Sequence, residues 1–415
     1  MIRRDIVDRE IQAWVADQDQ SRATYLEEVL AVTSRTRQRA AWSFPGRWIP
    51  MDLTMRRAFA PPALRYLALL VVIVLAVAAA AVVIVGSRRA PAPPYGLAAN
   101  GVIAYTSPDQ DIATIDPVTN EMKILVGGPD LDRTPVFSRD GSRVAFNRIT
   151  PEGSLLLAVD ASGGTPVQLT TTARPNLDEV TWSPDGSRIA FATNGEIAIV
   201  STDGSGALTM LPLGDATRAD SPAWRPPDGR EILFRGIEDE GYRLFLGPAD
   251  GRAEPTPLTA FVEYEFGWYF ATFTPDGTQI MTQRDVHAGQ CANLLSLGPG
   301  GPRIVDERLT APCPPTTIAP QLSPDGTRVA LAFPQDDQSG RIGVVSIDEP
   351  GSRKLIGPPD NGGIDWGYAW SPDGASLIHW LTKEDRIWIL DADGGPVRVP
   401  EWPGVRDADW QRRAP

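Results

Sequence analysis

One stretch, Val180-Thr-Trp-Ser-Pro-Asp-Gly-Ser-Arg-Ile-Ala-Phe191, decides how the rest of the chain is interpreted. It reads as a short apolar strand, a tight Ser-Pro-Asp-Gly turn and a second apolar strand. Proline presets φ for a type I turn, aspartate suits the next position, and glycine accepts the left-handed conformation that follows. Such a turn, with its glycine bulge, joins two antiparallel strands. The stretch therefore predicts a β-hairpin in which the aspartate serves the turn.

The same hairpin returns five more times with small changes. Its turn glycine recurs every 43 to 49 residues, at Gly141, Gly186, Gly229, Gly277, Gly326 and Gly374. A repeat of this length is typical of a propeller blade. Glycine and proline are abundant, with 38 and 39 residues, but they lie at turns between short strands, so they indicate an all-β fold.

The strand count predicts a closed ring. First strands of the repeat fall near residues 135, 180, 222, 271, 320, 367 and 408, and second strands near residues 102, 144, 189, 232, 280, 329 and 377. The segment Gly101–Thr106 reads as a second strand without a first, and Asp407–Gln411 supplies the missing one. We therefore expect a seven-bladed β-propeller of four-stranded antiparallel blades, closed by pairing of the C-terminal strand into the first blade. Closure removes sheet edges that invite aggregation.

These repeats resemble a known family. The recurring Ser-Pro-Asp-Gly, followed by Arg-Ile-Ala-Phe and later by Ile387-Trp-Ile-Leu-Asp-Ala-Asp-Gly-Gly395, is similar to the TolB-like propeller repeat, also called the WD-repeat-like Pro-Asp repeat. The resemblance covers about residues 100–411. It implies a propeller that serves as a binding platform in the bacterial envelope, although similar propellers also precede peptidase domains. Residues 1–62 do not resemble the N-terminal domain of TolB, so its partners are not carried over.

A membrane anchor is expected before the repeats. The run 66–85 contains no charged residue and is long enough to cross a bilayer as a helix. It is too long and begins too late for a cleaved signal peptide. Arg47, Arg56, Arg57 and Arg65 lie just before it, and only Arg88 and Arg89 follow closely, which favours a cytoplasmic N-terminus and an extracytoplasmic propeller. The expected domains are a short helical head at 1–62, a transmembrane helix at 63–87, a proline-rich linker at 88–99 and the propeller at 100–415.

Composition limits the chemistry. A net charge of −13 argues against nucleic-acid binding. With two histidines and two cysteines, no metal site and no cofactor are expected. The sequence has no Gly-x-Ser-x-Gly elbow, and few residues follow Trp410, so we expect no hydrolase domain and no enzyme. His287 and His379 each stand alone and are interpreted as structural or surface residues. Cys291 and Cys313 are favoured as a disulfide over two free thiols, because an extracytoplasmic domain permits one.

Candidate binding residues lie on the loops that lead into the first strands, which cluster around one mouth of a propeller. Charges and aromatic rings on such loops commonly form a recognition surface. The alternative is that the acids bond to neighbouring turns and the aromatic rings pack between blades. The candidates are Asp132, Arg133, Asp178, Glu179, Arg218, Asp220, Glu265, Trp268, Tyr269, Asp365, Trp366, Tyr368, Arg406 and Asp407.

Three functions remain open on the sequence. The leading hypothesis is a non-catalytic, single-pass membrane protein whose propeller is a platform or receptor for a protein or an envelope ligand. In the second, residues 1–62 bind a cytoplasmic regulator while the propeller senses outside, as in anti-sigma-like regulators. In the third, the propeller is a hydrolase or lyase that acts on envelope glycans, which would require paired carboxylates or histidines facing the channel.

Overall fold

The structure of the protein is a computed structural model. The residues it describes are 93–170, 178–260, 262–263, 268–286, 289–298, 301–306, 320–334, 340–349, 352–360, 366–381, 386–402 and 404–414. They belong to one of two compact units, Ser87–Pro415. The predicted head, the predicted membrane helix and the start of the linker lie outside the described residues. Among the described residues, no helix is long and apolar enough to cross a membrane.

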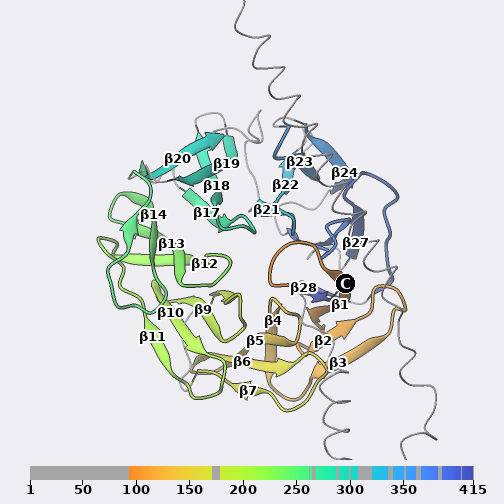
Figure 1. The fold of residues 1–415 in the computed structure, drawn as a ribbon. Coiled ribbons are helices and arrows are strands. Elements are labelled where there is room, and N and C mark those ends of the chain that lie inside the picture. Colours follow the sequence, from red (N-terminus) through yellow and green to blue (C-terminus); the bar gives the residue numbers. More distant parts are fainter. Residues whose placement is uncertain are drawn as a thin grey trace, which may run out of the picture. The chain divides into compact units, whose positions relative to one another are not determined.

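The described chain forms seven antiparallel sheets arranged as the blades of a ring (Figure 1). Blade 1 has the order β28 (Arg406–Arg413), β1 (Ala99–Thr106), β2 (Ile112–Ile115) and β3 (Met122–Val126). Blade 2 contains β4 (Leu131–Phe137), β5 (Arg143–Thr150), β6 (Gly153–Asp160) and β7 (Val167–Gln168). Blade 3 contains β8 (Asp178–Trp182), β9 (Arg188–Thr193), β10 (Glu196–Ser201) and β11 (Leu208–Met210).

The remaining blades follow in chain order. Blade 4 contains β12 (Arg218–Trp224), β13 (Glu231–Glu238), β14 (Gly241–Pro248), β15 (Thr256–Pro257) and β16 (Val262–Glu263). Blade 5 contains β17 (Trp268–Phe273), β18 (Gln279–Val286), β19 (Gly289–Gly298) and β20 (Gly301–Asp306). Blade 6 contains β21 (Gln321–Leu322), β22 (Arg328–Pro334), β23 (Gly340–Ser346) and β24 (Lys354–Asp360). Blade 7 contains β25 (Trp366–Trp370), β26 (Ser376–Leu381) and β27 (Arg386–Asp391).

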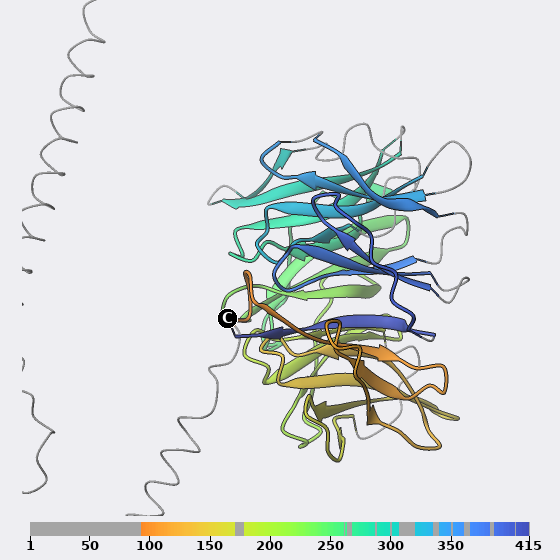
Figure 2. The same cartoon turned by 90° about the vertical axis from the view of Figure 1, so that its right-hand side faces the viewer.

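The predicted ring closure is confirmed. Strand β28 pairs with β1 and places Trp410 opposite Ile103, so the end of the described chain completes the first blade. The first described residues and the C-terminal strand lie on the same side of the ring (Figure 2), where Arg412 donates a hydrogen bond to the carbonyl of Pro93 at 3.0 Å. The two ends of the propeller therefore hold each other.

Two blades depart from the expected four strands. In blade 4, β15 is only two residues long and contains a proline, which cannot donate to a ladder; the far end of β14 pairs instead with β16. In blade 7, the described residues form three strands and one isolated bridge between Ile389 and Arg398. The intervening Gly394-Gly395-Pro396 explains why this edge forms no continuous strand.

The hydrophobic core is divided among the interfaces between blades. Seven clusters of buried side chains occur in the described residues, and each joins two neighbouring blades. Between blades 2 and 3, for example, Ala145 of β5 packs with Trp182 and Phe191 of blade 3. Each blade is therefore a thin sheet that is stable only between its neighbours.

The repeated turn has the predicted conformation. The six turn glycines all have left-handed φ values, between +63° and +74°. In blade 3 the Gly186 amide donates to the Ser183 carbonyl at 2.9 Å, while the Asp185 carboxylate accepts from the Ser183 hydroxyl at 2.6 Å and the Ser187 amide at 3.0 Å. Burial would raise the pKa of Asp185, but these hydrogen bonds outweigh it and lower the pKa. The aspartate therefore stabilises the turn as a carboxylate.

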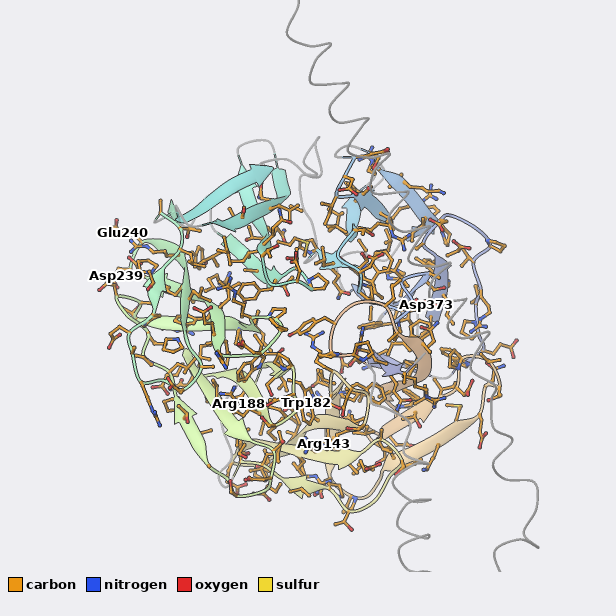
Figure 3. The ribbon with its side chains drawn as sticks, in the orientation of Figure 1. Arg143, Trp182, Arg188, Asp239, Glu240 and Asp373 are labelled. Atoms are coloured by element: carbon orange, nitrogen blue, oxygen red, sulfur yellow. The ribbon has the colours of Figure 1, made fainter. Side chains whose placement is uncertain are left out.

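An arginine after the turn clasps the next blade. Arg188 of blade 3 donates to the carbonyl of Gly229 in the blade 4 turn at 2.9 Å, and its guanidinium lies 4.7 Å from the ring centre of Trp224. The Trp224 indole in turn donates to the Thr181 carbonyl at 3.0 Å. Arg143 makes the same contacts with Gly186 and Trp182 (Figure 3). We call this arrangement the blade clasp.

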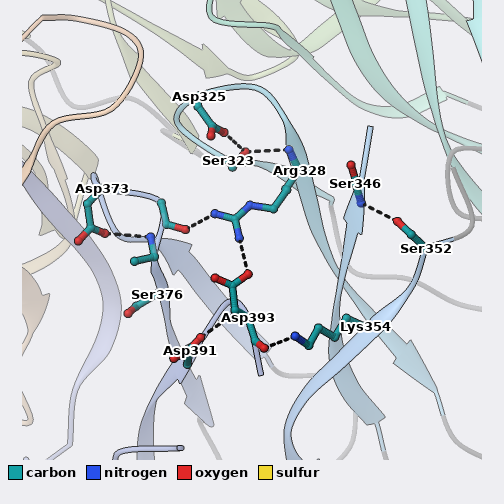
Figure 4. A network of polar contacts seen from close by, with 12 residues as sticks. Ser323, Asp325, Arg328, Ser346, Ser352, Lys354, Asp373, Ser376, Asp391 and Asp393 are labelled. Carbon is teal, nitrogen blue, oxygen red and sulfur yellow. Dashed lines mark hydrogen bonds and ion pairs between the residues drawn. The ribbon is translucent and has the colours of Figure 1, made fainter. Parts of the chain in front are cut away.

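The clasp recurs around the ring with substitutions. Arg328 of blade 6 donates to the Gly374 carbonyl at 2.6 Å and pairs with Asp393 at 3.4 Å (Figure 4). Arg225 donates to the Gly277 carbonyl at 3.2 Å, between blades 4 and 5. Blade 1 has no arginine after its first strand, and Gln411 takes this role toward the Gly141 carbonyl at 2.7 Å. Between blades 7 and 1, Asn100 and Asp373 exchange two hydrogen bonds.

Removing one clasp should destabilise the ring. Arg188→Ala loses a charged hydrogen bond and a stacked cation, and we expect it to lower the free energy of unfolding by about 2 kcal/mol. The measurement is urea unfolding followed by tryptophan fluorescence. Arg230→Ala is the matched control, because this side chain is 85% exposed and should change stability by less than about 0.5 kcal/mol. Equal midpoints for the two variants would show that the clasp contributes nothing.

Candidate functional site

The first strand of each blade lies nearest the centre of the ring (Figure 1). Each such strand runs toward the Pro-Asp-Gly turn, so its start lies at the opposite face. We call the two sides the turn face and the loop face. The predicted binding residues all belong to the starts of these inner strands or to the loops before them. They therefore belong to the loop face.

Four inner strands carry the same backbone distortion. Thr134, Glu179, Ser221 and Asp407 have left-handed φ values of 55°, 53°, 54° and 50°. Each lies three positions before an aromatic residue of its strand, and the strand pairing shifts register at the same place. Residues with a Cβ rarely adopt this conformation. A β-bulge of this kind re-aims side chains, and such strain clusters at functional sites. We call these four the bulge residues.

Polar contacts link bulge residues of neighbouring blades. The Glu179 carboxylate of blade 3 accepts hydrogen bonds from the Ser221 amide and, at 3.1 Å, from the Ser221 hydroxyl of blade 4. Between blades 1 and 2 the link runs through Thr106. Its hydroxyl accepts from the Thr134 amide at 3.2 Å and donates to the Asp407 carboxylate at 3.4 Å. The strained backbone amides are thus satisfied by side chains of the preceding blade.

Paired charges flank the bulges. Asp220 forms two hydrogen bonds with Arg235, at 2.7 and 2.5 Å, directly across the β12–β13 pair. The Arg235 guanidinium also lies 4.8 Å from the ring centre of Tyr242. Asp132, which is buried, forms an equivalent pair with Arg148, with both hydrogen bonds at 2.8 Å. These bidentate pairs hold ionised groups in fixed positions at the loop face.

We call the bulge residues, these two charge pairs and their neighbours at the loop face the polar wall. Two carboxyl groups of this wall have raised pKa values. Burial and then the nearby charge of Asp220 raise the pKa of Glu179, although part of this residue is exposed to solvent. Burial also raises the pKa of Asp407, against the opposing effects of Thr106 and Arg133. Glu179 and Asp220 therefore form a pair of carboxyl groups in different environments: the pKa of Glu179 is raised, and Asp220 is paired with Arg235. Such a pair can donate and accept protons.

The predicted residues are not all in one place. Asp132, Arg133, Glu179, Asp220 and Asp407 contribute to the polar wall; Arg133 donates to the Gln110 side chain at 2.9 and 2.6 Å. Arg218 and Arg406 are exposed near it. Tyr368 is buried between blades 6 and 7 and donates its hydroxyl to the Ala330 carbonyl at 3.2 Å, as the packing alternative expects. The predicted residues whose side chains lie outside the described part are Asp178, Glu265, Trp268, Tyr269, Asp365 and Trp366, and the two cysteines of the predicted disulfide, Cys291 and Cys313.

Several wall residues were not expected from the sequence. The sequence gives no signal for Ser221 and Thr134, because their role depends on backbone conformation and not on the type of side chain. Arg148 and Arg235 carried a usable signal, since each interrupts an otherwise apolar second strand and faces an aspartate in register. A charge inside an apolar strand requires a partner.

One of the two histidines can be followed in the structure. His379 is buried, burial lowers its pKa to about 4, and its Nδ1 lies 3.2 Å from the Gly367 carbonyl oxygen. This is the environment of a structural histidine. His287 lies outside the described residues. Within the described part of the chain, no group of three or more potential metal ligands comes together.

A cavity of about 510 Å³ opens elsewhere, between blades 1 and 2 near the turn face. Two of its charged residues bond to one loop: Lys123 donates to the Ser162 carbonyl at 2.5 Å, and Asp160 accepts from the Ser162 amide at 2.8 Å. It shares no residue with the bulges. The strained and titratable groups therefore make the loop-face wall the stronger candidate.

Comparison with known proteins shows the fold. No family model matches the sequence. The periplasmic gluconolactonase PpgL of Pseudomonas aeruginosa is similar at 16% identity and a TM-score of 0.55, over 76% of this chain and 99% of that chain. Oligogalacturonate lyase of Vibrio parahaemolyticus is similar at 10% identity and a TM-score of 0.53, over 74% and 85%. TolB of Acinetobacter baumannii is similar at 18% identity and a TM-score of 0.48, over 76% and 81%. The predicted TolB-like propeller is confirmed as a fold by its seven blades and repeated turns.

One expectation is corrected by these comparisons. The absence of a nucleophile elbow and of an added hydrolase domain led us to expect no enzyme. A gluconolactonase and a lyase have this fold, and the match covers 99% and 85% of their chains. A propeller can therefore carry catalysis without a second domain, and the missing elbow excludes only one kind of enzyme.

The pKa of Glu179 offers a direct test of the wall. Asp220→Asn removes the neighbouring negative charge and leaves Arg235 uncompensated, and both changes favour the glutamate anion. We expect the pKa of Glu179 to fall toward its ordinary value of 4.5, followed by carboxyl-carbon NMR of glutamate-labelled protein. Asp239→Asn, at the outer rim (Figure 3), should leave it unchanged. An unchanged pKa of Glu179 in the Asp220→Asn variant would show that the two carboxyl groups are not electrostatically coupled.

The same shift predicts a pH dependence of stability. Because the pKa of Glu179 is raised on folding, the folded state binds more protons than the unfolded state at pH values just above 4.5. Stability must then fall as pH rises through this window. Relative to Glu179→Gln, the natural protein should be less stable at pH 7.5 than at pH 4, measured as the difference in urea midpoint. A difference that does not change with pH would show that Glu179 titrates normally.

Proposed function

We propose that this propeller binds a polar ligand at the loop face of its inner wall. The observation that carries the proposal is the set of bulge residues, which repeat a strained conformation on four consecutive blades. The Pro-Asp-Gly turns already specify the hairpins, so the fold does not need this strain. Strain held in place by surrounding structure is a mark of sites built for recognition or catalysis.

The chemistry of the wall supports a hydrogen-bonding ligand. Glu179 and Asp407 are carboxyl groups with raised pKa values, and Asp220 and Arg235 present fixed charges beside them. Donors and acceptors of both signs within one rigid surface suit a molecule rich in hydroxyl, amide or carboxylate groups. A saccharide or an extended peptide of the cell envelope has such groups.

The cellular setting is part of the proposal. The uncharged run at 66–85 and the arginines before it support a single-pass anchor in the cell membrane, with the N-terminus in the cytoplasm and the propeller outside. In that setting the partner is a protein or an envelope component, and the net charge of −13 argues against nucleic acid. A cytoplasmic regulator bound to residues 1–62 stays a prediction from the sequence.

Binding is tested with variants of the wall. The full chain is immobilised in detergent and exposed to fractionated envelope extract, and retained molecules are identified by mass spectrometry. For a purified ligand, Glu179→Gln should weaken binding at least about tenfold, equivalent to about 1.4 kcal/mol. Asp239→Asn, at the rim of the same face, should bind like the natural protein. If the ligand binds Glu179→Gln and Asp239→Asn with equal affinity, the binding site lies elsewhere than at the wall.

A second function is favoured by one observation. Glu179 and Asp220 are neighbouring carboxyl groups, and the charge of Asp220 helps to raise the pKa of Glu179; general acid–base chemistry on a glycan uses such a pair. The test is turnover of uronate-containing oligosaccharides by the full chain across pH. Glu179→Gln should then reduce the rate by about 100-fold or more. Turnover that is equal in the natural protein and this variant would exclude Glu179 as the acid or base.

A further inference from the structure

One turn of the ring departs from the repeat at a single position. Five of the six turns carry proline before the aspartate, whereas blade 2 has Ser138-Arg139-Asp140-Gly141. Proline is the residue that suits this turn position best, so the arginine is not explained by the turn. The turn nevertheless forms normally: the Gly141 amide donates to the Ser138 carbonyl at 2.8 Å. Arg139 is therefore a candidate for another role.

A second arginine lies beside it. Arg412, near the end of β28, donates to the carbonyls of Pro93 and Gly96 at 3.0 and 2.6 Å and so holds the segment before β1. Burial, and then the positive charge of Arg139, lower the pKa of Arg412 to about 10. Two positively charged guanidinium groups thus interact on the turn face, although the net charge of the chain is −13.

The described protein does not neutralise this pair. Arg139 forms no ion pair with any described residue, and its guanidinium lies 5.2 Å from the ring centre of Tyr95. The nearby Asp409 carboxylate already accepts from the Phe137 amide at 2.7 Å and the Trp410 amide at 2.9 Å, and burial raises its pKa. Asp409 also attracts both arginines, but one carboxyl group beside two guanidinium groups leaves an excess of positive charge.

Two buried polar atoms in the same place have no hydrogen-bond partner among the residues that the structure describes. They are the hydroxyl of Tyr95 and the Nε of Arg412. Both residues interact electrostatically with Arg139 and with each other. A buried donor that has no acceptor is unfavourable. Two such donors beside two guanidinium groups indicate a missing acceptor with negative charge. Arg139 is only partly buried, so it can admit one from solvent.

We propose that Tyr95, Arg139 and Arg412 form a binding site for a phosphate group on the turn face. A tetrahedral oxyanion offers several acceptors in different directions, which matches two guanidinium groups and a phenol better than a planar carboxylate does. The group belongs either to free phosphate or to the headgroup of a phospholipid. This site is separate from the loop-face wall and does not depend on the function proposed for it.

The test uses the residue that the other repeats supply. Arg139→Pro restores the common turn, so the propeller should fold, and circular dichroism with the thermal midpoint checks that it does. Binding of inorganic phosphate and of glycerophosphoglycerol to the full chain is measured by calorimetry in detergent. We expect the natural protein to bind at least one of them and Arg139→Pro to bind it at least tenfold more weakly. Arg230→Ala, an exposed arginine of the blade 4 turn, should bind like the natural protein.

The results distinguish free phosphate from a lipid headgroup, and they distinguish both from water at the two donors. Tighter binding of glycerophosphoglycerol identifies a lipid headgroup, and tighter binding of inorganic phosphate identifies a free anion; either supports the site. If the natural protein binds neither probe, water satisfies the two donors and the proposal is wrong. It is also wrong if Arg139→Pro and the natural protein bind with equal affinity. Because Glu179→Gln leaves these three residues intact, it should not affect phosphate binding.

Discussion

The structure depends on the contact between an arginine of one blade and the turn of the next. Each blade is too thin to be stable alone, and its apolar side chains are buried only at the interfaces with its neighbours. The clasp sets the position of one blade on another, because Arg188 reaches the Gly229 carbonyl while lying over Trp224. It also provides a partner for a carbonyl of a tight turn. The Pro-Asp-Gly turn therefore joins the two strands of its own hairpin, and its glycine carbonyl accepts the hydrogen bond from the arginine of the preceding blade.

The clasp changes where the ring closes. Gln411 replaces the arginine between blades 1 and 2, and Asn100 with Asp373 joins blades 7 and 1. The one turn without proline lies at the same seam, together with Arg412 and the segment before β1. Departures from a repeat are tolerated where the repeat itself is interrupted, and local rules are most often broken at functional sites. The phosphate site that we propose on the turn face lies at this seam.

The sequence predicted those features that recur and missed those that depend on distant contacts. Turn residues determine local conformation, so seven blades and the closing strand followed from counting repeats. The bulge at Ser221 could not be found in this way, because its amide is satisfied by the carboxylate of Glu179, 42 residues earlier in the chain. Tyr368 was expected on a binding loop, yet alternation along its strand places it in the core. The expectation of no enzyme failed because it relied on a motif, whereas a propeller can place reactive groups on its inner wall.

Closure by the last strand is the central claim about this molecule, and hydrogen exchange tests it directly. Amide exchange of β1 is compared between the full chain and a chain that ends at Val405, which lacks β28. The account predicts that β1 loses its protection first, followed by the neighbouring blades 7 and 2, since their clasps and clusters include the lost strand. Unchanged protection of β1 in the shortened chain would show that the ring does not depend on this pairing, and would contradict the account.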